Sequence, residues 1–554
     1  MEKRVVIAIV ICVGILFAWM KLFPPPTSLG PTTAVNTPAA GTPATTPPGS
    51  TGATTPSAPA AAGATTAASP AVADRPEEQV ELLTPAVRFV FSSHGGTLRQ
   101  AQLRDPKYLM RKGDPGSGLQ LVNTGLPRFA PMRTEFPNSG FPTPNDGAWT
   151  VSRPAPDTVV FEAQTDTVRI EKRYRAEPLS YRLLLEVTVE NKAEKAVDHH
   201  LALHVYGHQD PEQRGGSFFT ASSANPASMI CEIGDKTERH SVEKLEKDPF
   251  DKLGYVQWIG ADDKFFLVAA VPFPESPPRD RKCTGTSPAP DIGDGMVSFT
   301  ERSLAPHTST TYPFIVFAGP KILTELEQVR PGSLDVRLGD AVDVTLAVIS
   351  RPILTLLKFF QTFTHNWGLA IILLTLFIKL LTFYPTQKSL LSAKKMQKLA
   401  PKMNALRKKF ESDKQRLSAE TMNLYKTHGV SPFGGCLPSL IQMPIWIALY
   451  STLNYAVELY RSPFVAHIHD LTAKDPYYIT PLLMGGVMFL QMRMSPASPD
   501  SQQQAMMAIM LPIMFTAFSL VLPSGLALYM LTSYLIGILQ QLYVNHIDRK
   551  TSAA

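Results

Sequence analysis

One lysine lies deep inside an apolar segment of this 554-residue chain. Residues 366–385 are long enough and apolar enough to cross a bilayer as a helix, since roughly 20 residues span about 30 Å of hydrocarbon. Counted from Trp367 at a rise of roughly 1.5 Å per residue, the Lys379 Cα lies about 18 Å along that helix, just past the membrane centre. A charge at this depth costs roughly 3 kcal/mol on insertion scales, so Lys379 is a functional candidate.

Further polar side chains occur inside the apolar segments that follow. Such positions are tolerated at membrane depth where they face protein or a wet cavity, so we expect a hydrated groove inside a helix bundle. The groove residues that we predict are Lys379, Thr375, Gln442, Gln491 and Ser519. The alternative is that Lys379 reaches the inner head groups, because Lys388 lies nine residues, or about 13 Å, further on. A lysine stem covers a good part of that distance.

Methionines are crowded into residues 484–514, where eight of them occur. Flexible thioether side chains suit apolar contact with many different sequences. The alternative role is to fill an irregular interface between helices.

The chain shows no pattern typical of enzymatic or metal chemistry. No G-x-S-x-G frame surrounds Ser524, and no histidine lies inside an apolar segment. His199, His200 and His204 have no carboxylate or cysteine at ligand spacing, so we interpret them as structural. We therefore predict no catalytic residue, no metal and no cofactor. The four cysteines form no CxxC pair, although Cys231 and Cys283 could form a disulfide if their domain is exported.

Three segments precede the lysine-bearing one. Residues 1–23 combine Lys3 and Arg4 with an apolar run, which indicates either a signal peptide or, as we prefer, an uncleaved transmembrane anchor with a cytoplasmic N-terminus. Residues 24–79 are mostly Pro, Thr, Ala, Gly and Ser with almost no large apolar residue, which is typical of a disordered linker. Residues 80–330 contain short β-type runs between glycine and proline breakers, which predict a large all-β sandwich. The clearest of these runs are 87–91, 158–161, 181–189, 265–271 and 314–317.

Residues 338–363 carry apolar side chains at helical spacing together with Arg351 and Lys358. This pattern suits an amphipathic helix in the outer membrane interface. A helix packed on the β domain fits the same pattern.

A basic segment follows the predicted span 366–386. Although the net charge of the chain is +6, residues 387–430 alone hold eleven basic residues, interleaved with apolar ones every three to four positions. We predict a basic helical hairpin on the cytoplasmic side, where its charge obeys the positive-inside rule. Its cations could bind RNA or a ribosome, but the lack of interleaved aromatic residues favours anionic lipid head groups. The residues that we single out are Lys394, Lys395, Lys398, Lys402, Arg407, Lys408 and Lys409.

Residues 434–546 contain four more apolar segments, at 437–457, 478–492, 506–522 and 526–544. With the anchor and the lysine-bearing segment, they predict a polytopic α-helical membrane protein of six spans with both termini cytoplasmic. Residues 547–554 form a short tail. Only Pro523, Ser524 and Gly525 join the last two spans, so these must form an antiparallel hairpin.

The motifs in this half of the chain resemble those of the YidC/Oxa1/Alb3 membrane protein insertases, in their Gram-negative YidC form. The resemblance is dense over residues 340–546. Its motifs are Asn366-Trp367-Gly368, Lys395-Met396-Gln397-Lys398-Leu399-Ala400-Pro401-Lys402, Gly434-Gly435-Cys436-Leu437-Pro438, Gln442-Met443-Pro444-Ile445 and Asp475-Pro476-Tyr477-Tyr478.

The resemblance implies a periplasmic β-supersandwich domain, five core spans around a groove open to cytoplasm and lipid, and a location in the inner membrane. It also implies that the partners are nascent membrane proteins, the Sec translocon, the ribosome with its targeting machinery, and anionic lipids, with no specific nucleic acid sequence. An apolar slide for the client helix would then be formed by Met443, Pro444, Ile445, Met510, Pro512 and Phe515.

One residue departs from the family pattern, because the cation in this span is usually arginine and here it is Lys379. Arginine binds carboxylates with two parallel hydrogen bonds, whereas lysine is a compact charge. A mechanism that needs only a positive potential survives the exchange.

Two other classes compete with an insertase. A secondary transporter could use the buried lysine, but such proteins carry inverted repeats, and none is visible in the sequence. A structural anchor that only presents the β domain would need little beyond residues 24–320.

Overall fold

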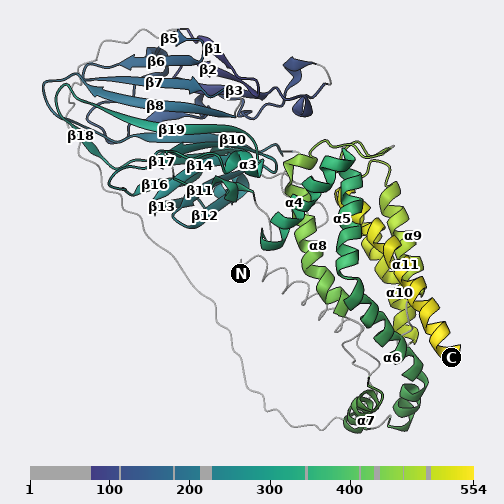
Figure 1. Ribbon diagram of the computed structural model, residues 1–554. Coiled ribbons are helices and arrows are strands. Elements are labelled where there is room, and N and C mark those ends of the chain that lie inside the picture. The colour runs from purple at the N-terminus through teal and green to yellow at the C-terminus, as the bar shows by residue number, and fades with distance from the viewer. Residues whose placement is uncertain are drawn as a thin grey trace, which may run out of the picture.

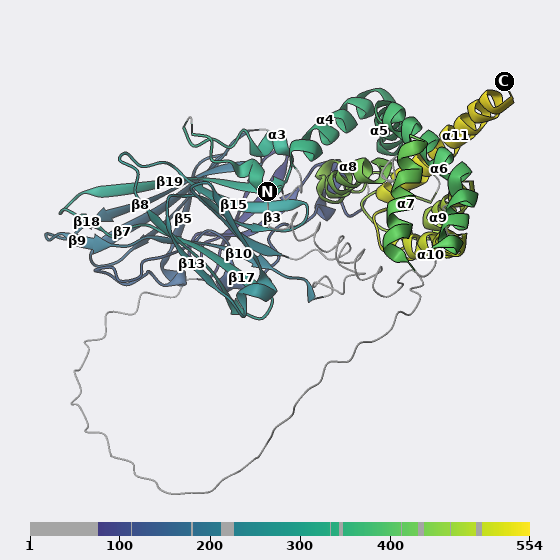
Figure 2. The same cartoon turned by 90° about the horizontal axis from the view of Figure 1, so that it is seen from below.

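The computed structural model describes residues 76–111, 114–178, 181–211, 227–332, 334–342, 347–410, 413–429, 437–465, 467–494 and 501–553. The predicted anchor 1–23 and nearly all of the predicted linker 24–79 lie outside these residues. The described chain forms a β domain and a bundle of helices beside it (Figure 1). Figure 2 shows that the bundle lies at one end of the β domain.

The β domain contains nineteen described strands in four sheets. The largest sheet has nine strands in the order β12-β11-β14-β15-β19-β8-β7-β6-β5, and the second has five in the order β13-β16-β17-β10-β4. The β domain also contains two small sheets, β1-β2-β3 and β18-β9. The strands are β1 Gln79–Leu83, β2 Val87–Ser92, β3 Thr97–Leu103, β4 Arg133–Glu135, β5 Thr150–Ala155, β6 Thr158–Gln164, β7 Val168–Ala176, β8 Arg182–Asn191, β9 Val197–His199, β10 Ala202–His208, β11 Ser228–Ile233, β12 Lys236–Ser241, β13 Phe250–Gly254, β14 Val256–Asp262, β15 Phe266–Pro272, β16 Arg281–Ala289, β17 Ile292–Ser298, β18 Arg302–Leu304 and β19 Ser309–Pro320.

Burial along the strands follows the layers of the domain. In β8 every second residue is buried, because one face of the strand contacts the core and the other faces solvent. In β15 all seven residues are buried, because the short helix α3 (Leu323–Leu326) and the 3₁₀ helix η6 (Leu338–Ala341) cover its second face. The continuous apolar run of β15 therefore reflects burial on both faces.

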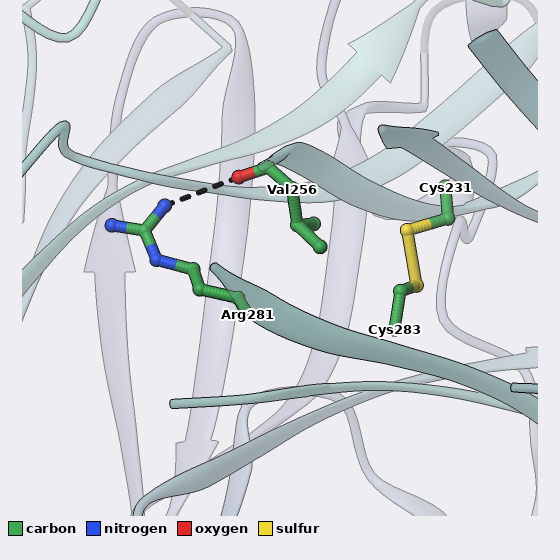
Figure 3. Close-up of a disulfide and its surroundings, with 4 residues drawn as sticks. All are labelled: Cys231, Val256, Arg281 and Cys283. Atoms are coloured by element: carbon green, nitrogen blue, oxygen red, sulfur yellow. Dashed lines mark hydrogen bonds between the residues drawn. A yellow bond between two sulfur atoms is a disulfide. The ribbon is translucent and has the colours of Figure 1, made fainter. Parts of the chain in front are cut away.

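A disulfide joins the two large sheets. Cys231 on β11 is bonded to Cys283 on β16, and both cysteines are fully buried (Figure 3). Beside it, the Arg281 guanidinium donates a hydrogen bond to the Val256 carbonyl. The pairing that the sequence left open therefore forms in this structure.

The helical part begins at α4 and ends at α11. Its helices are α4 Ala347–Thr364, α5 Trp367–Leu381, α6 Phe383–Lys409, α7 Lys414–Thr427, α8 Leu437–Tyr455, α9 Ile479–Met494, α10 Ser501–Ser519 and α11 Ser524–Ala553. The 3₁₀ helix η7 (Val457–Leu459) follows α8. The other short helices, in the β domain, are α2 Val242–Leu245, η1 Pro106–Tyr108, η2 Pro115–Ser117, η3 Pro127–Phe129 and η4 Asp146–Ala148.

The helices pack around α11, which contacts α5, α6, α8 and α9. α9 packs between α10 and α11, α11 packs on α5, and α4 packs on both α5 and α8. The shared apolar core includes Ile371, Leu449, Met484 and Leu526. Figure 1 shows α8 and the yellow-green helices α9 and α10 on different sides of the bundle.

The predicted span 366–386 is broken in the structure. α5 ends at Leu381, and α6 continues at an angle of 62° after Thr382. Pro385 lies in the first turn of α6, where a residue without an N–H is tolerated, but it leaves the carbonyl four residues earlier without a donor and interrupts the helix. The predicted span 366–386 therefore contains a bend near its end, and the bent pair α5 and α6 still passes the length and composition test as one broken span.

Other boundaries also differ from the prediction. The segment 338–363 contains η6 and then α4, which packs on α5 and α8 while Val348 and Phe363 stay exposed. α10 begins at Ser501, because a polar Ser-Gln-Gln-Gln turn precedes its apolar part. The turn between α10 and α11 is 520–523, so Ser524 and Gly525 already belong to α11.

Helix length and composition give a smaller count of spans than the sequence predicts. Among the described residues, Ser524–His546 of α11 alone is long and apolar enough to cross a membrane, and the bent pair α5 and α6 passes the same test as one span. Ile479–Met494 and Ala508–Ser519 are shorter apolar helices.

Candidate functional site

Lys379 lies in the last turn of α5, two residues before the helix ends. Its side chain is half-buried and forms no hydrogen bond or ion pair with any described residue. The neighbouring Leu380 and Leu381 are 64% and 74% exposed. The break at Thr382 thus places the lysine at the end of a helix of 15 residues, about 22 Å long, and not at the middle of a straight span.

Two of the predicted groove residues are satisfied within their own helices. The Thr375 hydroxyl donates to the Ile371 carbonyl at 2.7 Å, and the Ser519 hydroxyl donates to the Thr516 carbonyl at 2.8 Å. Both side chains are buried. Their hydroxyls therefore donate to backbone carbonyls of their own helices and not to Lys379.

The two predicted glutamines face α11. Gln442 on α8 donates to the Tyr529 hydroxyl at 2.5 Å. Gln491 on α9 lies so close to Gly537 that a Cβ there would be 2.4 Å from its Nε2. The structure thus places both amides against one helix, and neither is hydrogen-bonded to Lys379.

Several polar contacts of α11 were missed by sequence reasoning. The Tyr529 hydroxyl accepts a hydrogen bond from the Gln442 amide. Gln540 donates to the Phe383 carbonyl at 3.2 Å, and Gln541 donates to the Met494 carbonyl at 3.4 Å. The available signal was the adjacent glutamine pair in an apolar helix, since a buried amide needs partners. These bonds tie α11 to α6, α8 and α9.

The predicted apolar slide is divided between exposed and packed side chains. Met443 and Pro444 on α8 are exposed, as is Met510 on α10, while Ile445 and Phe515 pack against the helical core and Pro512 is buried. α8 packs against α4, α6 and α11, whereas α10 packs against α9, so the exposed parts of the slide lie on different sides of the bundle (Figure 1).

The predicted basic hairpin is formed by α6 and α7. Lys395, Lys398, Lys402, Arg407, Lys408 and Lys409 are exposed on α6, while Leu399 and Met403 are buried. Lys394 is half-buried, and its ammonium donates to the Val544 carbonyl of α11 at 3.4 Å. The outer cations thus face solvent, and the first one fixes α6 to the bundle.

Asn366 and Gly368 position the start of α5. The Asn366 side chain accepts a hydrogen bond from the Leu369 N–H, which caps the helix, and its amide donates to the Phe464 carbonyl. A Cβ at position 368 would lie 2.0 Å from the Phe464 ring, so only glycine permits this approach.

The buried cations of the β domain contrast with Lys379. Lys172 donates to the Gly95 and Met132 carbonyls at 2.8 and 2.6 Å, and Lys321 forms an ion pair with Asp262 at 2.8 Å. Burial lowers the pKa of Lys172 well below its usual value. These cations have fixed partners and are part of the fold.

The histidines and Ser524 have structural partners. His199 Nε2 lies 2.7 Å from the Tyr312 hydroxyl, and His204 Nδ1 lies 3.0 Å from both Asp294 oxygens. The Ser524 hydroxyl donates to the Asp470 carbonyl. Within the described ranges, no group of three or more His, Cys, Asp or Glu side chains could hold a metal ion.

A β-rich domain is joined to a helical region in which Lys379, near the end of a broken apolar helix, has no partner among the described residues. This arrangement is typical of a membrane protein with a large domain outside the bilayer. Two family models match the chain: YidC periplasmic domain over residues 79–356, and 60Kd inner membrane protein over residues 359–551.

The relatives agree with these models. A protein named membrane protein insertase YidC from Syntrophus aciditrophicus is 34% identical over 85% of both chains, and one of the same name from Geotalea daltonii is 33% identical over 98% of this chain and 99% of its own. The solved structure titled active YidC insertase with the first transmembrane domain resolved is 19% identical, covers 83% of this chain and 92% of its own, and has a TM-score of 0.34. The chain belongs to the YidC family of membrane protein insertases. Its clients are therefore nascent membrane proteins, and its β domain is periplasmic.

Proposed function

We propose that this insertase receives the polar outer segment of a client near Lys379 while the apolar client helix passes along the slide into lipid. In this proposal the chain has six spans with both termini in the cytoplasm, and five of the spans form the core. The energetic gain is a shorter and wetter path for polar backbone, which hydrocarbon would leave without hydrogen bonds. No bond is broken and no cofactor takes part.

The observation that carries the proposal is that the Lys379 ammonium has no partner in the part of the chain that the structure describes. A charge held by fixed partners stabilises a fold, whereas a charge without partners still has its hydrogen-bonding capacity available to a passing chain. Client outer segments that contain Asp or Glu would gain most from it. The last-turn position on α5 also lets the stem reach toward the cytoplasmic surface, where the client arrives.

The exposed part of the slide supports the second half of the path. Met443, Pro444 and Met510 present flexible or small apolar surface on α8 and α10, away from the shared core. Such surface accepts many sequences, which an insertase with diverse clients requires.

The basic hairpin supplies the proposed cytoplasmic contacts. Its exposed cations would bind anionic lipid head groups, each with roughly 1 kcal/mol, and would also meet the ribosome and the targeting machinery. We further propose that the chain acts either alone or together with the Sec translocon.

Site-specific photo-crosslinking during synthesis of a short client tests the path. A photoreactive residue at Met443 or Met510 should capture the nascent chain. The matched control is Val348, which is 90% exposed on α4 but lies outside the slide. Equal capture at all three positions, or capture at Val348 alone, would contradict the slide.

A further inference from the structure

The loop between α8 and α9 makes direct contact with the β domain. Val457 is fully buried and belongs to the hydrophobic core of the β domain, although it lies just two residues after α8 ends. Tyr460 packs against the same core, with its ring centroid 5.1 Å from Phe265, 5.4 Å from Phe266 and 6.1 Å from Tyr108. A segment of the helical part is thus inserted into the other domain.

Polar contacts reinforce this insertion. The Lys107 ammonium of the β domain donates to the carbonyls of Val457 and Glu458 at 2.9 and 2.8 Å. In the opposite direction, the Arg461 guanidinium donates to the Leu109 carbonyl at 2.9 Å. We call residues 456–462 the clasp. Hydrogen bonds from charged groups to buried carbonyls are strong, so the clasp fixes distance and orientation together.

A cavity and an ion pair lie next to the clasp. Beside it lies a cavity of about 530 Å³ between the β domain and the helical part, lined by Phe265, Tyr460, Asp470, Lys474 and Pro523 among others. The two parts are separated at this cavity and are in contact at the clasp beside it. α4 supplies a second support, since Lys358 forms an ion pair with Glu458 at 2.6 Å.

The clasp directly follows the end of α8. The inner part of that helix carries Met443 and Pro444, while its outer part is held by α4 through the hydrogen bond from the Ser350 hydroxyl to the Ala448 carbonyl. Between Pro444 and Tyr455 α8 is continuous, so a displacement at the clasp is carried along this part of the helix to Pro444.

We propose that the clasp transmits the position of the β domain to α8, so that Lys107 and Tyr460 are positioning residues for the client path. The coupling between the two domains stands on the contacts above, and only its consequence for clients rests on the proposed function. A partner that binds the β domain would thereby change the position of the slide without touching it.

Distance measurements between spin labels on the full-length protein in liposomes test the coupling. Cys12 and Cys436 are first replaced by Ser. The first pair of labels, at Glu301→Cys and Leu542→Cys, reports the distance between the β domain and α11. The second pair, at Met443→Cys and Leu542→Cys, reports the distance between α8 and α11. Lys107→Ala combined with Tyr460→Ala should abolish the single narrow distance peak for both pairs. Lys107→Arg combined with Tyr460→Phe should restore both peaks, because the charge and the ring return.

The matched control is Lys236→Ala with Leu253→Ala, two exposed positions on the same domain, which should leave both peaks unchanged. Continued protection of the Cys231–Cys283 disulfide from reductant shows that the β domain stays folded. If it does not, Tyr460→Leu alone replaces the double variant and is judged by the same two peaks. Loss of the first peak with an unchanged second peak would overturn the coupling, and so would two unchanged peaks.

Photo-crosslinking at Met443 separates this inference from the proposed function. Coupled distances with no client captured at Met443 would reject the slide and keep the coupling. Client captured at Met443 with uncoupled distances would do the opposite.

Discussion

The buried cations of the β domain and Lys379 of the helical part have opposite surroundings. In the β domain Lys172, Arg281 and Lys321 are almost completely buried, and each donates to backbone carbonyls or to a carboxylate. In the helical part Lys379 has no such partner among the described residues. A cation with fixed partners is committed to the fold, whereas one without partners is available for transient contacts.

The difference also explains why the two regions need different tests. Removing a satisfied cation leaves buried acceptors without donors, so stability should fall. Removing Lys379 leaves no orphaned partner in the described structure, so stability should change little and function should change. The predictions below use this contrast, from the largest expected effect to the smallest.

Lys172→Ala should destabilise the β domain by about 3–5 kcal/mol, because it leaves a cavity and two carbonyls without a donor. Chemical unfolding followed by tryptophan fluorescence measures this, since the Lys172 ammonium lies 5.6 Å from the Trp149 ring. Arg173→Ala, next along β7 and exposed, is the control and should cost less than about 0.5 kcal/mol. Equal losses for the two variants would break the comparison.

Replacing both Cys231 and Cys283 by Ser should cost about 2–4 kcal/mol, because the disulfide closes a long loop in the unfolded chain and joins the two large sheets. The same unfolding experiment should show a similar loss for the native chain after reduction in denaturant. An unchanged midpoint would mean that packing alone holds the sheets together.

The β domain should also lose stability in mild acid because of His199. Burial lowers the pKa of His199 to about 4, against an ordinary value of about 6.5. Between these two pH values the imidazole is protonated in the unfolded chain and neutral in the folded chain. The loss begins as pH falls below about 6.5 and grows until about pH 4, at roughly 1.4 kcal/mol per unit. Midpoints at pH 7.5 and 5.5 should differ less for His199→Gln than for the native chain, and an identical difference would remove His199 as the cause.

Neutralising one exposed cation of the basic hairpin should have the smallest effect. Lys408→Gln should weaken binding to anionic vesicles by roughly 1 kcal/mol, and added salt should reduce the difference. Lys394→Gln should behave differently, because Lys394 donates to the Val544 carbonyl and is half-buried. A vesicle flotation assay in which both variants bind alike would show that burial does not separate their roles.

The strands that could be predicted from the sequence are those with a local pattern of apolar residues. The runs at 158–161 and 181–189 became β6 and β8, because short runs of β-branched, aromatic and other apolar residues between breakers indicate strands. β12 was not predicted, since its residues Lys236–Ser241 are polar and it is a strand through its pairing with β11. Pairing partners are set by the tertiary fold and leave little local signal.

The candidate site was predictable only in part for the same reason. Lys379 is conspicuous by its residue type, but its position in a last turn depends on the break at Thr382, which the local pattern around Pro385 indicates only in retrospect. Thr375 and Ser519 were predicted as groove residues from polarity alone, and the structure shows their hydroxyls bonded to their own helices. The clasp at Val457 and Tyr460 joins residues about 350 positions apart in sequence, as in the Lys107 to Val457 contact, and no local pattern reports it.

The most direct test of the unpartnered lysine compares two clients in reconstituted vesicles. The clients share one apolar helix and differ only in an outer segment that carries either Asp residues or Asn at the same positions. Lys379→Ala should reduce protease-protected insertion of the acidic client by about tenfold, which corresponds to a loss of about 1.4 kcal/mol of charge attraction. Insertion of the neutral client should fall much less. Lys379→Arg should restore insertion of both clients. Equal insertion of both clients by Lys379→Ala and by the native chain would contradict a role for the charge.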